Sequence, residues 1–119
     1  MQFAVLIYQD WTWIDGLQED SGLSETELAE IGKEYTELAA TPGFQQNIPF
    51  GHPKDATTVR VQDGKAIASE GTVGGLSAAA GSVYVFEAED KVAAIEFASR
   101  IPAARLGGAI EVRPIGQYW

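Results

Sequence analysis

The sequence contains no cysteine and a single histidine, His52. Without cysteine the chain forms no disulfide and has no thiol chemistry, and a zinc or iron site normally needs several thiolate or imidazole ligands. We therefore expect no metal and no cofactor, and any metal would have to be a hard cation held by carboxylates. A chain of 119 residues buries roughly two thirds of its unfolded surface, so it needs neither a disulfide nor a metal to fold.

Basic side chains are also few. Eight lysines and arginines stand against 17 aspartates and glutamates, which gives a formal net charge of −9. Phosphate backbones repel so acidic a chain, and we expect no nucleic acid partner. The apolar opening Phe3–Ile7 has no basic residues before it and is too short to span a bilayer. We therefore expect no signal peptide, no membrane partner and a cytoplasmic location.

No segment rich in proline, serine or charge divides the chain, which predicts a single domain over residues 1–119. Residues 3–8 and 82–88 are apolar on both faces, a pattern typical of central strands. Residues 57–62 and 109–115 instead alternate between apolar and polar side chains. These two segments are therefore predicted as strands that are covered on one face only.

Two helices are predicted. The first begins at Ser24, which forms a capping box with Glu27, and ends at Thr41–Gly43. Its apolar stripe consists of Leu28, Ile31, Tyr35 and Leu38. The second helix begins after the cap Asp90 and ends near Arg100. Its inward side chains are predicted to be Val92, Ile95 and Ala98.

The strongest turn signal is Asp63-Gly64, between Thr57–Gln62 and Lys65–Ser69. This dipeptide fits a two-residue type I′ turn, because both positions accept positive φ, and it predicts a β-hairpin. The segment Phe44–Phe50 is only weakly patterned and predicts at most a short irregular strand.

The order strand, helix, hairpin, strand, helix, strand predicts an α+β fold of the ferredoxin-like type. Such a sheet is antiparallel, has the strand order 4-1-3-2 and carries both helices on one face. The doubly apolar segments 3–8 and 82–88 would be the central strands, and 57–62 and 109–115 the edges. The uncovered face would then be apolar at its centre, so we expect a two-fold homodimer through the sheet face.

Several segments resemble the DGPF branch of the YCII-related proteins. They are Asp55–Gly64, Tyr84–Ala88, Ala98–Arg105 and Glu111–Ile115, together with the N-terminal Leu6-Ile7-Tyr8. They span nearly the whole chain, in the same order and with compatible spacing. The resemblance implies a ferredoxin-like α+β fold that dimerises through its sheets, a dimeric α/β barrel.

The signature motif of that family is rebuilt in this chain. Where the family has Asp-Gly-Pro-Phe and a polar stretch with a Glu and a Lys, this chain has Glu70–Val73 followed by Gly74–Ala80. Glu70 keeps a carboxylate, but the proline, the phenylalanine and the second carboxylate are missing. Some YCII relatives resemble lyases or dehalogenases that use an early histidine paired with an aspartate, and this chain has no early histidine. The resemblance therefore does not transfer an activity intact.

His52 and Glu70 are the candidate catalytic residues. An imidazole is the side chain whose ordinary pKa lies nearest neutrality, which suits a general acid or base. The alternative is that His52, between Gly51 and Pro53, is simply an exposed loop residue. Glu70 stands at a strand end and at the family's acidic position, and its alternative is a solvated hairpin end.

The aromatic residues suggest a ligand site. Trp11, Trp13 and the closing Tyr118–Trp119 either line a pocket for an aromatic or polycyclic ligand, or cap the barrel and the dimer seam. Arg60 is a candidate for binding a carboxylate or enolate, and its alternative is a dimer salt bridge or protection of an edge strand. The complete set of predicted substrate-binding residues is Tyr8, Trp11, Trp13, Arg60, Thr72 and Tyr84.

Two functions of different classes follow from these residues. The first is a cofactor-free lyase, isomerase or cyclase that acts on a hydrophobic carbonyl or aromatic-derived substrate, with Glu70 or His52 as acid or base. In that case Tyr8, Tyr84 and Arg60 would polarise the substrate oxygen. The alternative is a non-catalytic dimeric module that binds a small hydrophobic ligand without turnover, and a purely structural dimer is a third possibility.

Overall fold

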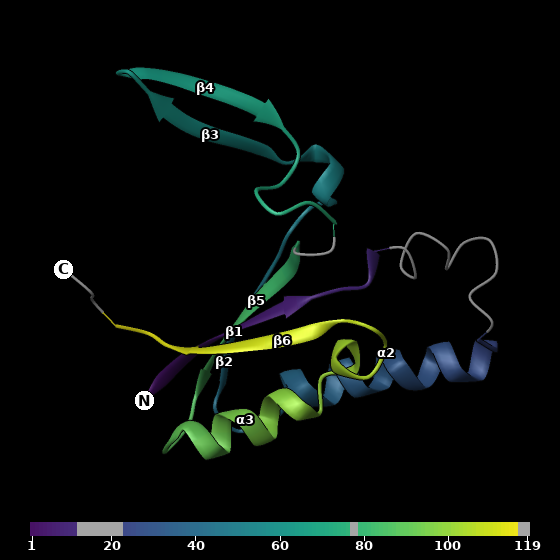
Figure 1. The fold of residues 1–119 in the computed structure, drawn as a ribbon. Helices are drawn as coiled ribbons and strands as arrows, with labels where there is room; N and C mark the ends of the chain where they lie inside the picture. The colour runs from purple at the N-terminus through teal and green to yellow at the C-terminus, as the bar shows by residue number, and fades with distance from the viewer. Residues whose placement is uncertain (12–22, 77–78, 117–119) are drawn as a thin grey trace.

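The computed structural model describes residues 1–11, 23–76 and 79–116 (Figure 1). These described residues form an antiparallel sheet of four strands, a separate two-stranded hairpin, two α-helices and two short 3-10 turns. In chain order the elements are β1 (Gln2–Tyr8), α2 (Glu25–Ala39), β2 (Phe44–Pro49), the turn Pro53–Asp55, β3 (Thr57–Gln62), β4 (Lys65–Glu70), β5 (Ala80–Glu87), α3 (Lys91–Ser99), the turn Pro102–Ala104 and β6 (Ala109–Pro114).

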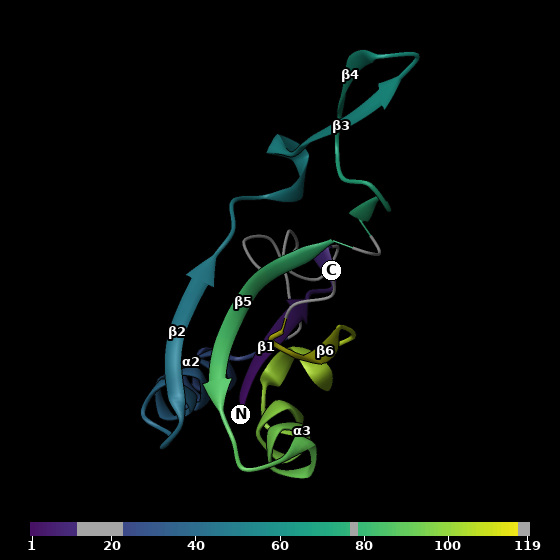
Figure 2. The ribbon, with the colours of Figure 1, turned by 90° about the vertical axis from the view of Figure 1, so that its left-hand side faces the viewer.

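The main sheet has the order β2-β5-β1-β6, and both helices lie against one of its faces (Figures 1 and 2). The two strands at its centre, β1 and β5, are those predicted from their apolar residues on both faces. Counted along the chain without the hairpin, this order is the 4-1-3-2 arrangement of the ferredoxin-like fold. The predicted α+β class is therefore confirmed.

The prediction of the second edge strand was wrong. The strand beside β5 is β2, which pairs from Phe44 opposite Phe86 to Pro49 opposite Ser82 with a bulge near its start. Phe44 packs its ring edge-on against Tyr84, with ring centroids 5.1 Å apart, and so joins the core. This tertiary contact outweighs the poor strand propensity of the glutamines and asparagine that follow.

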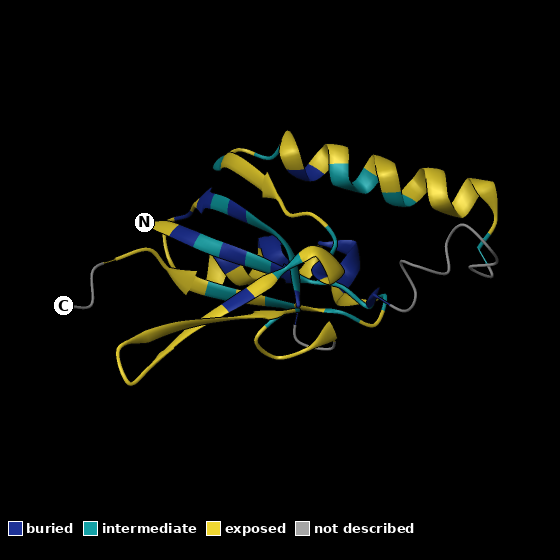
Figure 3. Cartoon of the chain, turned by 90° about the horizontal axis from the view of Figure 1, so that it is seen from above, coloured by how far each residue is buried: buried dark blue, intermediate teal, exposed yellow. Residues whose placement is uncertain are grey.

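The predicted hairpin is present but stands apart from the main sheet. β3 and β4 pair from Thr57 opposite Glu70 to Gln62 opposite Lys65, and Asp63 and Gly64 have φ of 52° and 76°, as a type I′ turn requires. This hairpin, residues 57–70, is called the arm below. It projects on the side of the sheet turned away from the helices, and nearly all of it is exposed (Figures 1 to 3).

The arm makes the molecule longer than a compact domain. The radius of gyration is 16.4 Å, whereas a compact chain of this length has about 13–14 Å. Apart from the pairing of β3 with β4, the arm makes only marginal contacts with the other described helices and strands.

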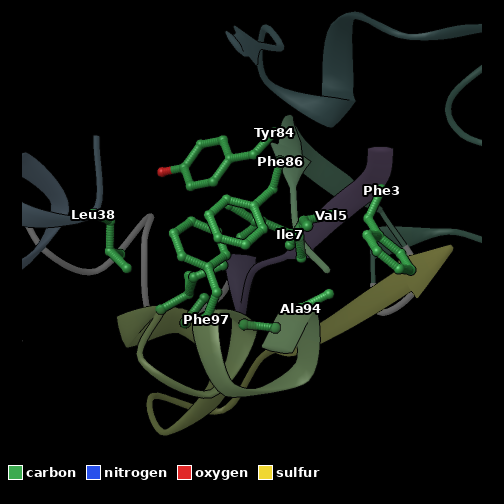
Figure 4. Close-up of a cluster of buried hydrophobic side chains, with 12 residues drawn as sticks. Phe3, Val5, Ile7, Leu38, Tyr84, Phe86, Ala94 and Phe97 are labelled. Carbon is green, nitrogen blue, oxygen red and sulfur yellow. The ribbon is translucent and has the colours of Figure 1, made fainter. Parts of the chain in front are cut away.

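One cluster of buried apolar side chains fills the space between the main sheet and the helices (Figure 4). Phe97 of α3 stacks on Phe86 of β5, with ring centroids 4.0 Å apart and an angle of 9° between the rings. The cluster consists of Phe3, Val5, Ile7, Leu38, Tyr84, Phe86, Ala88, Ala94, Phe97, Ala98, Ile101 and Ala103.

The buried face of α3 differs from the prediction. Val92 and Ile95 are exposed, and of the three predicted inward residues only Ala98 is buried. The buried stripe is instead Ala94, Phe97, Ala98 and, just beyond the helix, Ile101. This stripe also has helical spacing, and it buries the large ring of Phe97, which gains more from leaving water than a valine does.

Helix α2 begins as predicted. The Ser24 side chain accepts a hydrogen bond from the backbone amide of Glu27 at 3.1 Å. Of its apolar stripe only Leu38, near the C-terminal end, is buried, while Leu28 is exposed. Only the last part of the helix therefore contributes to the core.

The opposite face of the main sheet carries apolar side chains at its centre, as predicted. They come from the two central strands and are half-buried: Ala4, Leu6, Val83 and Val85. No described helix lies over this open face (Figure 1).

None of the helices in the described part of the chain is long and apolar enough to cross a membrane.

Candidate functional site

A pocket of about 430 Å³ lies at the base of the arm. It forms where the loop after β2 meets the segment after β4 and the start of β5. Among the described residues its walls are mostly apolar or backbone, and three of them have polar side chains, His52, Asp55 and Thr72. The described lining residues are Phe50, Gly51, His52, Pro53, Asp55, Ala56, Thr72, Val73, Gly74, Ala79 and Ala80.

His52 is held in this pocket by the backbone that follows it. It caps the turn Pro53–Asp55, and its Nδ1 accepts a hydrogen bond from the backbone amide of Lys54 at 3.0 Å. A neutral imidazole that accepts through Nδ1 carries its proton on Nε2. In this form His52 can donate a hydrogen bond through Nε2.

Trp11 supports His52. The two rings are 5.1 Å apart between centroids and inclined at 57°. The indole is buried, and its Nε1 donates a hydrogen bond of 2.9 Å to the carbonyl of Ala79, in the pocket wall. Gly81 leaves room for this ring, because a Cβ added there would lie 3.2 Å from Trp11 Cζ2. These contacts join the chain after β1 to the pocket wall before β5.

The segment that follows β4 supplies another wall of the pocket. Thr72, Val73 and Gly74 line it. The segment is tied to the base of the arm by two hydrogen bonds of 2.8 Å, from the Gly71 amide to the Ala56 carbonyl and from Thr58 Oγ1 to the Gly71 carbonyl. This segment therefore forms one wall of the pocket and is fixed to the base of the arm.

Glu70 lies outside the lining. It is exposed and ends β4, opposite Thr57. The structure therefore brings His52 and Thr72 together with Trp11 behind them, and leaves Glu70 at the base of the arm, two residues before Thr72.

Tyr8 lies at the edge of the open sheet face. Its hydroxyl is 3.4 Å from Glu111 Oε1, and Arg113 Nε is 3.7 Å from Glu111 Oε2. Burial raises the pKa of the Tyr8 phenol, and the negative charge of Glu111 raises it further, against a smaller opposite effect of Arg113. Tyr8 therefore keeps its proton at neutral pH. Its side chain does not line the pocket, although its backbone pairs with Ala80, which does.

Tyr84 and Arg60 lie away from the pocket. Tyr84 is buried on the helix side of the sheet, and burial, with a smaller effect from Tyr35, raises the pKa of its phenol to about 12. Arg60 is exposed on the arm rather than on an edge of the main sheet, where it was predicted. Neither side chain lines the pocket.

A sequence comparison places the chain in a family. The profile of the YCII-related domain matches residues 1–118. The chain belongs to the YCII-related domain family. The match extends over the sheet, both helices, the arm and the pocket of this YCII-related domain. No curated protein matches the sequence.

Some residues of this YCII-related domain were missed by the sequence prediction, and others lie outside the described residues. Phe50 and Asp55 line the pocket but were not predicted as site residues. Trp13 and Tyr118–Trp119 lie outside the described residues. Among the described residues, no group of three or more histidines, cysteines, aspartates and glutamates is arranged to hold a metal ion.

Proposed function

We propose that this YCII-related protein binds a small hydrophobic carbonyl compound in the pocket at the base of the arm. The observation that carries the proposal is the placement of His52, which lies in a mostly apolar pocket and is held by the Lys54 amide and the Trp11 ring. A mostly apolar pocket with a few polar groups in defined orientations is typical of a small-molecule site.

The chemistry we propose is cofactor-free proton transfer, as in a lyase, isomerase or cyclase. The Nε2 proton of His52 would polarise the substrate carbonyl, and a carboxylate would take the proton from the adjacent carbon and return it to the product. Asp55 lines the pocket and is the nearer candidate for this carboxylate. Glu70, at the base of the arm, is the other candidate.

The second candidate function is a dimeric module that binds the same ligand without turnover. Its support is that Glu70, one of the two predicted acid–base residues, lies outside the lining of the pocket. Under both functions we propose a homodimer through the open sheet face, supported by the uncovered Leu6 and Val83. The absence of nucleic acid and membrane partners, and the cytoplasmic location, stay predictions.

Binding is tested with a panel of aromatic and polyketide-like carbonyl compounds, measured by tryptophan fluorescence and by thermal shift. A ligand in this pocket should change the fluorescence of the wild type, and Trp11→Phe should remove most of that change while the thermal shift persists. If no compound changes either signal, both ligand-binding functions are wrong.

Turnover is then tested on any compound that binds. His52→Gln, which keeps an acceptor for the Lys54 amide, should lower turnover by about 100-fold or more and change Kd much less. Asp55→Asn and Glu70→Gln distinguish the two carboxylates, because only the one that accepts the proton should match the His52→Gln loss. Binding without turnover by the wild type would support the non-catalytic module.

A further inference from the structure

The arm has an apolar face and a polar face. In the hairpin pairing Val59 lies opposite Ala68 and Val61 opposite Ala66, so these four side chains share one face. The two valines are 63% and 69% exposed. The other face carries Thr58, Arg60, Gln62, Lys65, Ile67 and Ser69. The arm is therefore an amphipathic ribbon whose apolar face is uncovered by any described part of the chain.

Such a ribbon is not stable by itself. A lone two-stranded hairpin is marginal in water, and it becomes stable when another layer covers its apolar face. Among the described residues, the arm is tied down near its base, where Thr58 Oγ1 donates a hydrogen bond to the carbonyl of Gly71. Beyond the base, β3 and β4 have only marginal contacts with the other described elements.

A second uncovered apolar surface lies on the same side of the molecule. The open sheet face, with Leu6 and Val83 at its centre, is turned away from the helices, and so is the arm (Figures 1 and 2). A single partner molecule bound on that side would contact both apolar surfaces.

The combined size of the two surfaces fits a protein partner. Strands of this length are about 20 Å long and lie about 4.8 Å apart, so that the sheet face and the arm face together offer roughly 600 Å² of flat area. Each partner in a typical specific protein complex buries about 800 Å². Two identical copies related by a two-fold axis present the same pair of apolar surfaces to each other. Each copy can therefore cover the exposed apolar surfaces of the other.

We propose that the arm of each protomer packs its Val59 and Val61 face on a second copy of this chain. This contact rests on the dimer proposed above and adds to it an exchange of arms. The arm also borders the pocket, since Asp55 precedes β3 and Thr72 follows β4. Docking of the arm would hold these two walls in place, so ligand binding and dimerisation should strengthen each other.

Sedimentation equilibrium on the full chain tests this contact with a matched pair of variants. Val61→Lys places a charge on the apolar face and should raise the dimer Kd by about 100-fold or more. Gln62→Lys adds the same charge at the next position, on the opposite face, and should change Kd by about threefold at most. Leu6→Lys, on the open sheet face, should also weaken the dimer. Circular dichroism melting verifies that each variant is folded.

The outcomes separate the arm contact from the dimer itself. A wild-type chain that is monomeric at high micromolar concentration overturns both. If Leu6→Lys weakens the dimer while Val61→Lys and Gln62→Lys both change its Kd little, the dimer forms through the sheet face without the arm. That result overturns the arm contact and leaves the dimer in place.

A second measurement uses the absence of cysteine. Gln62→Cys gives the chain a single thiol for a nitroxide label. Mixed dimers of labelled chains and ¹⁵N-enriched unlabelled chains should then show broadened amide signals in the enriched copy, which report where the arm lies. A mixed dimer with no such broadening would show that the arm does not touch its partner.

Discussion

The core and the arm differ in what holds them in shape. The arm follows from local chemistry, because Asp63-Gly64 adopts the turn and the flanking residues pair around it. At the edge of the core, β2 has a weak local pattern and is held by Phe44 packing on Tyr84 and by pairing with β5. A strong local signal therefore specifies the shape of a segment, whereas burial determines how much that segment contributes to folding stability.

Removal of the central ring of the core should give the largest difference between the two regions. Phe97 is fully buried and stacked on Phe86, so Phe97→Ala should lower the free energy of unfolding by roughly 3–5 kcal/mol. Ile67→Ala on the polar face of the arm should lower it by about 0.5 kcal/mol or less. Urea unfolding measures both, and equal losses would show that the arm belongs to the same cooperative core.

Titration of Tyr84 should weaken the core at high pH. Burial raises the pKa of its phenol to about 12, above the value near 10 in the unfolded chain. The stabilisation is fully present below about pH 10 and is lost as the pH rises through 12, a loss of roughly 2–3 kcal/mol.

Tyr84→Phe removes the titrating group, so its urea unfolding should depend less on pH over this range than that of the wild type. If the two chains have parallel stability profiles between about pH 9 and 12, Tyr84 does not ionise with unfolding.

A methyl group at Gly43, at the start of β2, should cost about 2 kcal/mol or more. Gly43 has φ of +100°, and an added Cβ would lie 2.3 Å from the backbone oxygen of Glu87. Gly32→Ala is the control, because Gly32 lies inside α2 with nothing within 4 Å of an added Cβ, and it should stabilise the helix by up to about 1 kcal/mol. Thermal melting should move the two variants in opposite directions.

The smallest effect is expected at the tip of the arm. Gly64 has φ of +76° with open space around it, so Gly64→Ala should cost about 1 kcal/mol, confined to the hairpin. Hydrogen exchange should speed up for the amides of β3 and β4 and stay unchanged for β1 and β5. Faster exchange in the central strands would mean that the arm and the core unfold together.

Much of the fold followed from patterns within single segments. The central strands β1 and β5, the cap of α2 at Ser24 and the bounds of the hairpin to within one residue were all predicted. The buried face of α3 was not, since two apolar stripes of helical spacing overlap there, and the choice between them depends on which one meets the sheet.

The candidate site, too, could be predicted from the sequence only in part. His52 was predicted as a candidate from its residue type, but its contact with Trp11 joins residues 41 positions apart, and Asp55 was not predicted as a site residue. The pocket likewise forms from segments before β3, after β4 and before β5 that meet only in the folded chain.

The sequence by itself determined the family, the α+β class, the two central strands and the turn of the arm, because each depends on residues close together in the chain or on a pattern along its whole length. Only the tertiary structure decided that β2 rather than the hairpin borders β5, and that the arm stands free beside a pocket. These outcomes depend on which distant side chains bury one another, and a local pattern does not encode that competition.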